Sequence, residues 1–533
     1  MFKGGKMAKK LVIIGGGDAG TYTVEALFKK GAEVLKQFEI TLVKKEKGGS
    51  ASICAVPLAL QGVFNMKEVA EIDPPETFVS HGIDYRTETE ATGINLEESS
   101  VRLGSLGSPG SLGSPGSLGS PGSPGSLGSE EEIKYDFLVI ATGRRPRVPD
   151  VLKIPGAEGE GRGLAGVYTM STVEDGEKIE AAMNSPEAKN AVVLGGGTIG
   201  LQVALAFLKK GLKTRVVVGH PTPLSSILDP DMGSLVRARL EKEGVEFIFG
   251  KQVKEIKGDG AKVKSKVKSV VVGGPEAREG EGEREGEGER EGEGEREGEG
   301  EREEIPADIV VISRGMIPNT ELAEKAGLQI GETGGIVTNQ YLQVKRRQGQ
   351  AEGGKYIKNV YALGDCVEVV DAITLRPRLS QLASSALVQA KVVANNLTGV
   401  GYSLEPALSP AVATISDFQV GTVGITTETA ARFGMKVVSG KKEKPTRARF
   451  YQGRKTMAVK LLFDSYSERL VGAQLVSEEM VADRIDGLCN AIRKGVTAKE
   501  LSRMEKSFDP CVSLHRDVMV DAAESAVEQF GKD

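Results

Sequence analysis

Residues 10–20 read Lys-Leu-Val-Ile-Ile-Gly-Gly-Gly-Asp-Ala-Gly, an apolar strand that runs into spaced glycines. Helical sequence follows, and a second strand, Glu-Ile-Thr-Leu-Val, occupies 39–43. Glycines between a strand and a helix allow a tight turn and let a pyrophosphate approach the free N–H groups of the helix N-terminus. The pattern predicts a dinucleotide-binding βαβ unit over 11–43. A βαβ unit that binds no nucleotide is the alternative.

The candidate dinucleotide contacts in this turn are Gly15, Gly17, Asp18, Ala19 and Gly20.

The second strand ends unusually for such a unit. An acidic residue is expected there to hold the adenosine ribose, but Lys44 occupies the position and Glu46 follows two residues later. A lysine has no acceptor for ribose hydroxyls. We therefore expect Glu46 or backbone groups to substitute beside Lys44.

The strand–glycine–helix pattern occurs a second time. Residues 191–200 read Ala-Val-Val-Leu-Gly-Gly-Gly-Thr-Ile-Gly, and the next strand covers 214–218. Two dinucleotide units in one chain are more specific than one, and FAD together with NADH or NADPH is the commonest reason to need both. The candidate contacts here are Gly195, Gly197, Thr198, Ile199 and Gly200.

Two later strands end in turns of the same kind. The apolar strand at 135–140 runs into Ala141-Thr142-Gly143, and the strand at 359–363 runs into Gly364-Asp365-Cys366. From about residue 407 the pattern changes to short strands and two helices. This part is predicted to be a separate α+β unit.

A lone cysteine follows the first βαβ unit. Residues 50–57 read Ser-Ala-Ser-Ile-Cys-Ala-Val-Pro, and no second cysteine lies three to six residues from Cys54. The chain has 4 widely spaced cysteines, which is unlike the disulfide framework of a small secreted protein. A reducing cytosol and a catalytic role for a redox cysteine fit better. An inert core cysteine is the alternative.

Composition excludes several classes of protein. A chain of 533 residues predicts two to four domains, and it contains no apolar run of about 18 residues that could span a membrane. The net charge of −5 hides a segment, 276–304, with 15 Glu and 5 Arg; the rest of the chain therefore carries about +5. A mild excess of that size gives no case for nucleic acid binding, and no metal site is predicted.

Two low-complexity repeats interrupt the chain. Residues 104–129 repeat Gly-Ser-Leu-Gly-Ser-Pro, and the segment 274–304 is dominated by repeated Glu-Arg-Glu-Gly-Glu-Gly. Neither composition can bury a core. Strand-like sequence flanks each repeat, so we expect disordered loops inserted into two β-hairpins. Interaction tails are the alternative.

Taken together, these motifs resemble the pyridine nucleotide-disulfide oxidoreductases. Within that family the resemblance is to the single-cysteine branch, which contains coenzyme A-disulfide reductases, NADH oxidases, NADH peroxidases and persulfide reductases. The similarity covers Lys10 to Phe530 except the two repeats. The motifs are Gly15 to Gly20, Ser50-x-x-x-Cys54-x-x-Pro57, Ala141 to Gly143, Gly195 to Gly200 and Gly364 to Cys366.

The resemblance implies an α/β fold with two Rossmann-like domains, for FAD and NAD(P), and a C-terminal α+β dimerisation domain. The implied boundaries are 8–152 with 323–405 for FAD, 153–322 for NAD(P), and 407–533 for the domain that makes a homodimer. It further implies hydride transfer from nicotinamide to flavin, then electron transfer to Cys54. Asp365 would bind the ribityl chain and Ser50 would lie beside the flavin.

Departures from the family pattern bear on the subtype. Asp18 stands where NADH peroxidases carry a histidine, which argues against a peroxidase. Thr198 and Gln202 stand where tyrosine and glutamate are usual, so gating of the flavin face is unsettled. The strand end at 218–220, Val-Gly-His, lacks the acid of NADH-specific members. His220, with Arg215 nearby, would tolerate a 2′-phosphate, so either NADH or NADPH is expected.

The C-terminal segment departs most from the family pattern. Residues 508–513 read Phe-Asp-Pro-Cys-Val-Ser, and His515 follows. In the family this segment reaches the active site of the partner subunit. We hypothesise that Cys54 and Cys511 of the two subunits form a redox pair, with Asp509 or His515 moving protons. A passive packing substitution at Cys511 is the alternative.

The sequence thus predicts a cytoplasmic FAD-dependent NAD(P)H oxidoreductase. Its substrate would be a small disulfide, persulfide or polysulfide such as coenzyme A disulfide, with no nucleic acid or membrane partner. The alternatives are an NADH oxidase that reduces oxygen, a reductase of a ferredoxin- or rubredoxin-type carrier, and a binding flavoprotein with little turnover.

Overall fold

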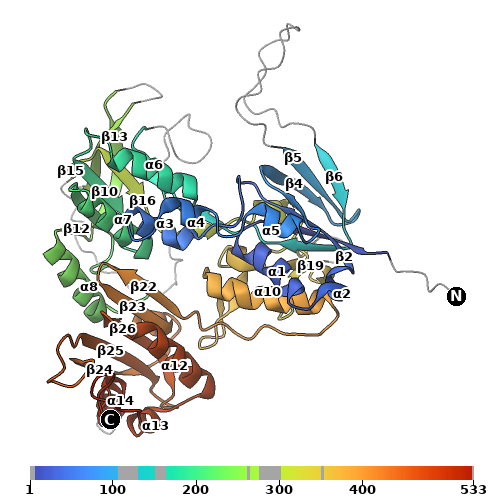
Figure 1. Ribbon diagram of the computed structural model, residues 1–533. Coiled ribbons are helices and arrows are strands. Elements are labelled where there is room, and N and C mark those ends of the chain that lie inside the picture. Colours follow the sequence, from blue (N-terminus) through green and yellow to red (C-terminus); the bar gives the residue numbers. More distant parts are fainter. Residues whose placement is uncertain are drawn as a thin grey trace, which may run out of the picture. The chain divides into compact units, whose positions relative to one another are not determined.

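The computed structural model describes residues 7–105, 130–149, 164–260, 265–274, 302–349 and 353–530. The chain forms two compact units, each assembled from separate stretches of sequence (Figure 1). The first unit contains Met1–Ser52, Lys67–Arg145 and Met316–Ser409, and the second contains Ile53–Met66, Pro146–Gly315 and Pro410–Asp533. The three predicted domains stay a prediction, since compact units and ligand-binding domains need not share boundaries.

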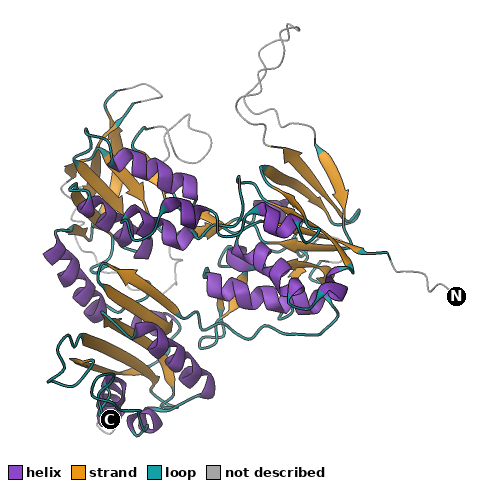
Figure 2. Ribbon diagram, in the orientation of Figure 1, coloured by secondary structure: helices purple, strands orange, loops and turns teal. Residues whose placement is uncertain are grey.

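A six-stranded sheet organises the first unit (Figure 2). Its strands, in spatial order, are β18 (Gln343–Lys345), β19 (Tyr356–Ala362), β7 (Phe137–Ile140), β1 (Lys9–Ile14), β2 (Phe38–Val43) and β3 (Asp84–Arg86). All run parallel except β18. Continuous apolar runs form the central strands because both of their faces are buried. Ile14 pairs with Val43 and with Ile140, so β1, β2 and β7 end at one edge.

Alternate side chains of β1 enter different cores on the two faces of this sheet. Leu11 and Ile13 share a core with residues of α1 (Asp18–Phe28) and α10 (Ala383–Leu397). Val12 and Ile14 share the opposite core with residues of an antiparallel sheet, β4-β5-β6. This sheet consists of β4 (Thr89–Asn95), β5 (Ser100–Ser105) and β6 (Glu131–Lys134).

The smaller elements of the first unit connect these layers. The helices are α2 (Ala32–Leu35), α5 (Pro75–Val79), α9 (Glu321–Lys325) and the 3₁₀ helix η3 (Gly364–Cys366). The strands form two short pairs, β8 (Arg144–Pro146) with β17 (Met316–Pro318) and β20 (Glu368–Val370) with β21 (Pro377–Leu379). Helix α4 (Met66–Ala70) lies where the chain returns to this unit.

The second unit contains a five-stranded, fully parallel sheet. Its strands, in spatial order, are β12 (Glu246–Phe249), β11 (Lys213–Val218), β10 (Asn190–Leu194), β16 (Ile309–Ile312) and β9 (Val167–Thr169). Its helices are α6 (Val173–Met183), α7 (Thr198–Lys209) and α8 (Pro230–Glu243). A three-stranded antiparallel sheet adds β13 (Gln252–Gly258), β14 (Val267–Gly273) and β15 (Glu303–Pro306). Both predicted strand–glycine–helix units are therefore confirmed.

The segments that flank the two repeats pair as predicted. Strands β5 and β6 are antiparallel from Ser100–Lys134 to Leu103–Glu131, and β14 and β15 are antiparallel from Ser269–Pro306 to Val272–Glu303. Residues 106–129 and 275–301 lie outside the described residues.

The cysteine-bearing segment belongs to the second unit, although it follows β2 of the first unit in sequence. It forms a 3₁₀ turn, η1 (Ile53–Ala55), and a short helix, α3 (Val56–Leu60). Helix α3 packs on α6 and α7. Nothing in the local sequence pattern pointed to this placement.

The C-terminal part folds as the predicted α+β structure. An antiparallel sheet has the order β22 (Ala411–Ile415), β23 (Phe418–Gly424), β26 (Leu470–Ser477), β25 (Thr456–Asp464) and β24 (Val437–Pro445). The helices are α11 (Thr427–Arg432), α12 (Val481–Lys494), α13 (Ala498–Ser502) and α14 (Val518–Phe530). Helix α12 packs on β23 and β26, and α14 packs on β24 and β25.

No helix within the described ranges is long and apolar enough to cross a lipid bilayer.

One buried ion pair fixes the start of α14. The Arg484 guanidinium donates to both carboxylate oxygens of Asp517, at 2.9 and 2.8 Å. Asp517 is only 2% exposed, and it also accepts from the Met519 N–H at 2.9 Å. Burial alone would raise the pKa of Asp517, but the hydrogen bonds and charge of Arg484 outweigh burial and lower it.

We expect Asp517→Asn to lower the free energy of unfolding by about 3 kcal/mol, because it leaves the largely covered Arg484 side chain, 13% exposed, without its counter-ion. The native pKa is depressed, so this stabilisation is present above the unfolded pKa of about 3.9 and is lost as pH falls. Urea unfolding at several pH values should show the native–variant difference shrinking in acid. Asp486→Asn, an exposed carboxylate on α12, is the control, and an equal effect there would contradict the prediction.

Candidate dinucleotide and thiol sites

The first glycine turn leaves no room for side chains where it meets the sheet. Gly15 has φ +117°, and a Cβ there would lie 2.0 Å from the carbonyl oxygen of Ala141. A Cβ on Gly20 would lie 1.9 Å from the carbonyl oxygen of Gly15. Gly17, which precedes α1, has nothing within 4 Å of its Cβ position. The turn is therefore closed toward the sheet and open at the helix N-terminus, where N–H groups can receive an anion.

Lys44 does not replace the acidic residue that would contact the ribose; its hydrogen bonds are to the backbone. It is buried, and its ammonium donates to the carbonyls of Gly48, at 3.3 Å, and Gly49. Its methylenes lie against Gly16. Glu46 is exposed beside it. Lys44 thus holds the turn that leads to Ser50, and the Glu46 carboxylate is exposed beside this turn.

Two residues near this turn carry no sequence motif. Asp73 accepts from the Ser50 hydroxyl at 2.8 Å, and its carbonyl accepts from the Ser50 N–H at 3.0 Å. The Tyr85 hydroxyl is buried without a hydrogen-bond partner and lies 2.8 Å from the Cβ position of Gly16. Burial raises its pKa. An unpaired buried hydroxyl at the glycine turn is a donor that a bound ligand can satisfy.

Three strand ends meet at this edge of the sheet. Ala141 to Gly143 follow β7, and the Thr142 hydroxyl donates to the Asn319 carbonyl at 2.6 Å. Asp365 follows β19 in η3, where Gly364 has φ +83° and its Cβ position lies 2.6 Å from the Ala19 Cβ. Asp365 pairs with the Arg144 guanidinium at 3.2 Å. The structure thus brings together all three predicted motifs of the first unit.

The carboxyl groups at this edge repel one another. Burial raises the pKa of Asp18, and Asp365 and Asp73 raise it further, whereas Arg144 lowers it. The pKa of Asp365 is also raised, chiefly by burial, with Arg144 acting in the opposite direction. Glu25, on the next turns of α1, has its pKa raised by burial and by Asp73. Two cations act in the opposite direction, Arg144 on Asp18 and Asp365 and Lys29 on Glu25.

The second glycine turn repeats the first. Gly195 has φ +125° and a Cβ position 2.0 Å from the Ser313 carbonyl oxygen. A Cβ on Gly200 would lie 2.3 Å from the carbonyl oxygen of Gly195, and Gly197 is open. Thr198 and Ile199 begin α7. This turn too is closed toward the sheet and open at the helix N-terminus.

The residues at the carboxyl end of β11, which are expected to distinguish NADH from NADPH, differ from the sequence prediction in one respect. Arg215 lies three residues before the strand ends and donates to Glu246 at 2.8 Å. It is therefore not at the carboxyl end with His220, which is exposed. Of the two basic residues, only His220 lies beyond the carboxyl end of β11.

Gln202, where the family usually has glutamate, is buried. Its side-chain amide donates to the Thr414 carbonyl at 2.9 Å, and its backbone carbonyl accepts from the Gln61 side chain at 2.8 Å. It therefore ties together α7, α3 and β22.

The two cysteines of the hypothesised pair are both exposed. Cys54 lies in η1. The N–H of Cys511 donates to Asp509 at 2.8 Å, and the His515 ring meets Phe508 edge to face at 5.6 Å. Asp509, Cys511 and His515 thus share one loop. The four cysteines, all within the described ranges, form no disulfide in this chain.

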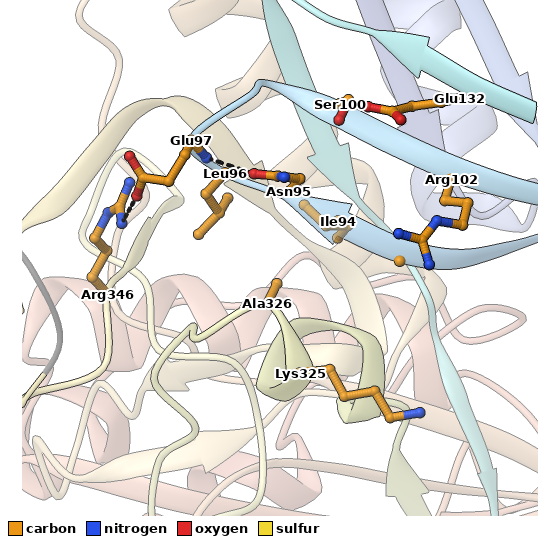
Figure 3. Close-up of a pocket in the computed structure, with 11 residues that line it drawn as sticks. Ile94, Asn95, Leu96, Glu97, Ser100, Arg102, Glu132, Lys325, Ala326 and Arg346 are labelled. Carbon is orange, nitrogen blue, oxygen red and sulfur yellow. Dashed lines mark hydrogen bonds and ion pairs between the residues drawn. The ribbon is translucent and has the colours of Figure 1, made fainter.

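A polar cavity lies apart from these motifs (Figure 3). Its volume is about 350 Å³, and strands β4 and β5 and helix α9 contribute to its walls. Arg346 pairs with Glu97 across it at 2.7 Å. None of the predicted site residues lines it.

Comparison with known proteins decides the family. Residues 9–390 match the family described as pyridine nucleotide-disulphide oxidoreductase, and residues 410–517 match its dimerisation domain. The chain belongs to this family. As a member, it is an oxidoreductase that uses FAD and NAD(P)H.

Individual family members cover almost the whole chain. An NADH oxidase of Methanocaldococcus jannaschii is 32% identical over 522 residues, which are 98% of this chain and 99% of the relative. An NAD(P)H coenzyme A polysulfide/persulfide reductase of Pyrococcus horikoshii is 26% identical over 508 residues, covering 95% of this chain and 96% of the relative. The solved NAD-dependent persulfide reductase from A. fulgidus has a TM-score of 0.80 at 28% identity, with 98% of this chain and 84% of that chain covered.

Asp18 generates a prediction about FAD retention. A pyrophosphate dianion at the α1 N-terminus would add charge beside Asp18, Asp365, Asp73 and Glu25, so we expect Asp18 to take up a proton as FAD binds. Between the pKa values of Asp18 in the free and loaded protein, the FAD dissociation constant should then rise with pH, by up to about tenfold per unit. Asp18→Asn should bind FAD more tightly at the upper end of this range and lose the slope.

Flavin fluorescence titrations of the apoprotein across pH measure this dependence. Glu25→Gln, on the same helix, is the matched control and should keep the slope. A native dissociation constant that does not change with pH, or a slope lost in Glu25→Gln instead, would contradict the prediction.

Proposed function

We propose that the protein is an FAD-dependent NAD(P)H oxidoreductase that reduces a small disulfide, persulfide or polysulfide, such as coenzyme A disulfide, through Cys54. The observation that carries the proposal is the exposed Cys54 thiol on a 3₁₀ turn, in a family enzyme with two complete dinucleotide turns. Relatives named as coenzyme A-linked sulfur reductases support the substrate class.

The cofactor contacts follow from the two glycine turns. Gly15, Gly17, Asp18, Ala19 and Gly20 would hold FAD, with Glu46 toward the ribose hydroxyls, Asp365 toward the ribityl chain, and Lys44 and Ser50 fixing the adjoining turn. Ala141, Thr142 and Gly143 would line the same edge. Gly195, Gly197, Thr198, Ile199 and Gly200 would hold NADH or NADPH, and His220 would meet the 2′-phosphate of NADPH.

Cys54 would perform the sulfur chemistry as a thiolate. Its attack on a disulfide forms one S–S bond, breaks another and releases the first thiolate, leaving a mixed disulfide on Cys54. The thiolate of the partner subunit's Cys511 would then attack Cys54, release the second thiolate and leave a Cys54–Cys511 disulfide, which two electrons reduce to the two thiolates. FAD, when bound, links the two-electron chemistry of nicotinamide to that of sulfur.

The match to the dimerisation domain supports a homodimer. We infer that in this homodimer Cys511 of the partner subunit meets Cys54. Phe508 and Val512, which flank Cys511, are 53% and 58% exposed. Apolar side chains exposed together are typical of a surface that a partner covers. Asp509 and His515, in the same loop, would carry protons. We also infer a reducing compartment, the cytoplasm, because cysteines remain in the thiol form there.

An NADH oxidase is the second candidate. The M. jannaschii relative carries that name, and the usual gating tyrosine is replaced by Thr198, which could leave a reduced flavin open to oxygen. A reductase of a protein carrier is the third candidate, because such a carrier takes electrons from the flavin edge without a cysteine.

Replacing the Cys54 thiol distinguishes the three candidate functions. We expect Cys54→Ser to lower NAD(P)H-dependent reduction of coenzyme A disulfide or polysulfide at least about 10³-fold, since serine cannot form the mixed disulfide. Cys54→Ser should still reduce a carrier or an artificial electron acceptor. Anaerobic assays of each acceptor, with oxygen uptake measured in parallel, distinguish the candidates. Retention of disulfide reduction in Cys54→Ser would remove the proposal.

Cys511 is tested by disulfide mapping of the oxidised dimer. We expect an inter-subunit Cys54–Cys511 linkage and an at least about tenfold lower turnover in Cys511→Ser, because the second thiol resolves the mixed disulfide. Cys489→Ser, on α12 of the same C-terminal structure, is the matched control and should turn over normally. Unchanged turnover in Cys511→Ser with no such linkage would refute this pairing.

A further inference from the structure

The cysteine segment is held unusually close to α6. Gly176 is buried within this helix, and a Cβ there would lie 2.3 Å from Cγ1 of Val56. Val56 follows Cys54 by two residues and is fully buried. Real Cβ atoms need roughly 3.8 Å from a neighbouring carbon, so the backbone of α6 approaches Val56 in a way that only glycine allows.

Hydrogen bonds at the start of α6 help to hold Gly176 in place. Thr172 caps α6 by accepting from the Asp175 N–H at 3.1 Å. The Asp175 carboxylate, itself buried, accepts from the N–H and hydroxyl of Ser171 at 2.9 and 3.1 Å. The first turn of α6 is thus fixed, and Val56 has to fit against it.

The far end of α3 is held by α7. The Gln61 side-chain amide donates to the Gln202 carbonyl at 2.8 Å, and the Lys209 ammonium donates to the Gln61 carbonyl at 3.3 Å. Figure 1 shows α3, near the start of the chain, beside α6 and α7. Both ends of α3 therefore contact helices of the second dinucleotide-binding fold, α6 and α7. Cys54 lies exposed just before α3.

Glycine inside a helix is unfavourable unless packing requires it, because alanine loses less backbone freedom. Val56 is β-branched and stiff about its first side-chain torsion, so it has little freedom to turn away from an added methyl group. We propose that Gly176 is a positioning residue for Cys54, and that the contact it permits with Val56 sets where the thiol stands. This rests on the proposed function only in treating Cys54 as the redox thiol.

A methyl group at residue 176 would displace Val56 by about 1.5 Å, the difference between 2.3 Å and roughly 3.8 Å. A shift of this size can cost a correctly aligned reaction about a hundredfold. It would act on the sulfur step and leave nicotinamide binding at the separate glycine turn unchanged.

The test compares Gly176→Ala with two matched variants. Gly487→Ala, a helical glycine of α12 whose Cβ position is open, controls for the gain of an alanine in a helix. Val56→Ala with Gly176→Ala removes the clashing methyl groups and should restore the native arrangement. The rate and pH profile of Cys54 alkylation, read by mass spectrometry of its peptide, are measured with disulfide turnover and the melting temperature.

We expect Gly176→Ala to change the Cys54 alkylation rate, and to lower disulfide turnover, by about tenfold or more, with the KM for NAD(P)H unchanged. The double variant should recover both, and Gly487→Ala should match the native protein. If Gly176→Ala does not fold, Gln61→Ala, which releases the other end of α3, should shift the same alkylation profile in a folded protein.

Native alkylation and turnover in Gly176→Ala, or a loss that Val56→Ala does not rescue, would overturn the inference. Alkylation reports where the thiol stands even if Cys54 carries no turnover. Failure of this inference is therefore distinguishable from failure of the proposed function.

Discussion

Two glycines that lie against backbone carbonyls set the arrangement on which the rest of the structure depends. Gly15 approaches Ala141, and Gly195 approaches Ser313, each with a Cβ position 2.0 Å from the carbonyl oxygen. Any side chain would force the neighbouring strand ends apart. Because none is present, each helix starts directly at the carboxyl edge of its parallel sheet. The free N–H groups of that helix then face the space where strand ends from distant parts of the chain converge.

The two turns differ in the charge of the first residue of the helix that follows them. Helix α7 begins with neutral Thr198, whereas α1 begins with Asp18. A carboxylate in the first turn favours the helix dipole, and it competes with any anion that approaches the same N–H groups. Burial and neighbouring carboxyl groups raise the pKa of Asp18, so a negative charge at the start of α1 is less favourable than the helix dipole alone would make it.

Much of this could be predicted from the sequence because it depends on local patterns. Both glycine turns, the strands around them and the C-terminal helices follow from apolar runs and glycine spacing. The sequence pattern shows that Lys44 is out of place, but its contact with the carbonyls of Gly48 and Gly49 depends on a turn that no pattern specifies. Asp73 and Tyr85 lie near the first glycine turn only because the residues between β2 and β3 fold back toward it, which no sequence motif indicates. The attachment of residues 53–66 to the second unit depends on the close approach of Val56 to Gly176 and on hydrogen bonds between Gln61 and α7. These partners lie more than a hundred residues away in sequence.

The paired strands that flank the repeats have a practical consequence for protein engineering. The chain leaves β5 near Leu103 and re-enters β6 near Glu131, its partner in the ladder, and the same holds for Val272 and Glu303. A polypeptide whose own termini lie close together can be spliced into such a point at a small entropic cost, because closing a longer loop depends only logarithmically on its length. The two hairpins are therefore natural acceptor positions for a fluorescent or affinity module, leaving both chain termini unmodified.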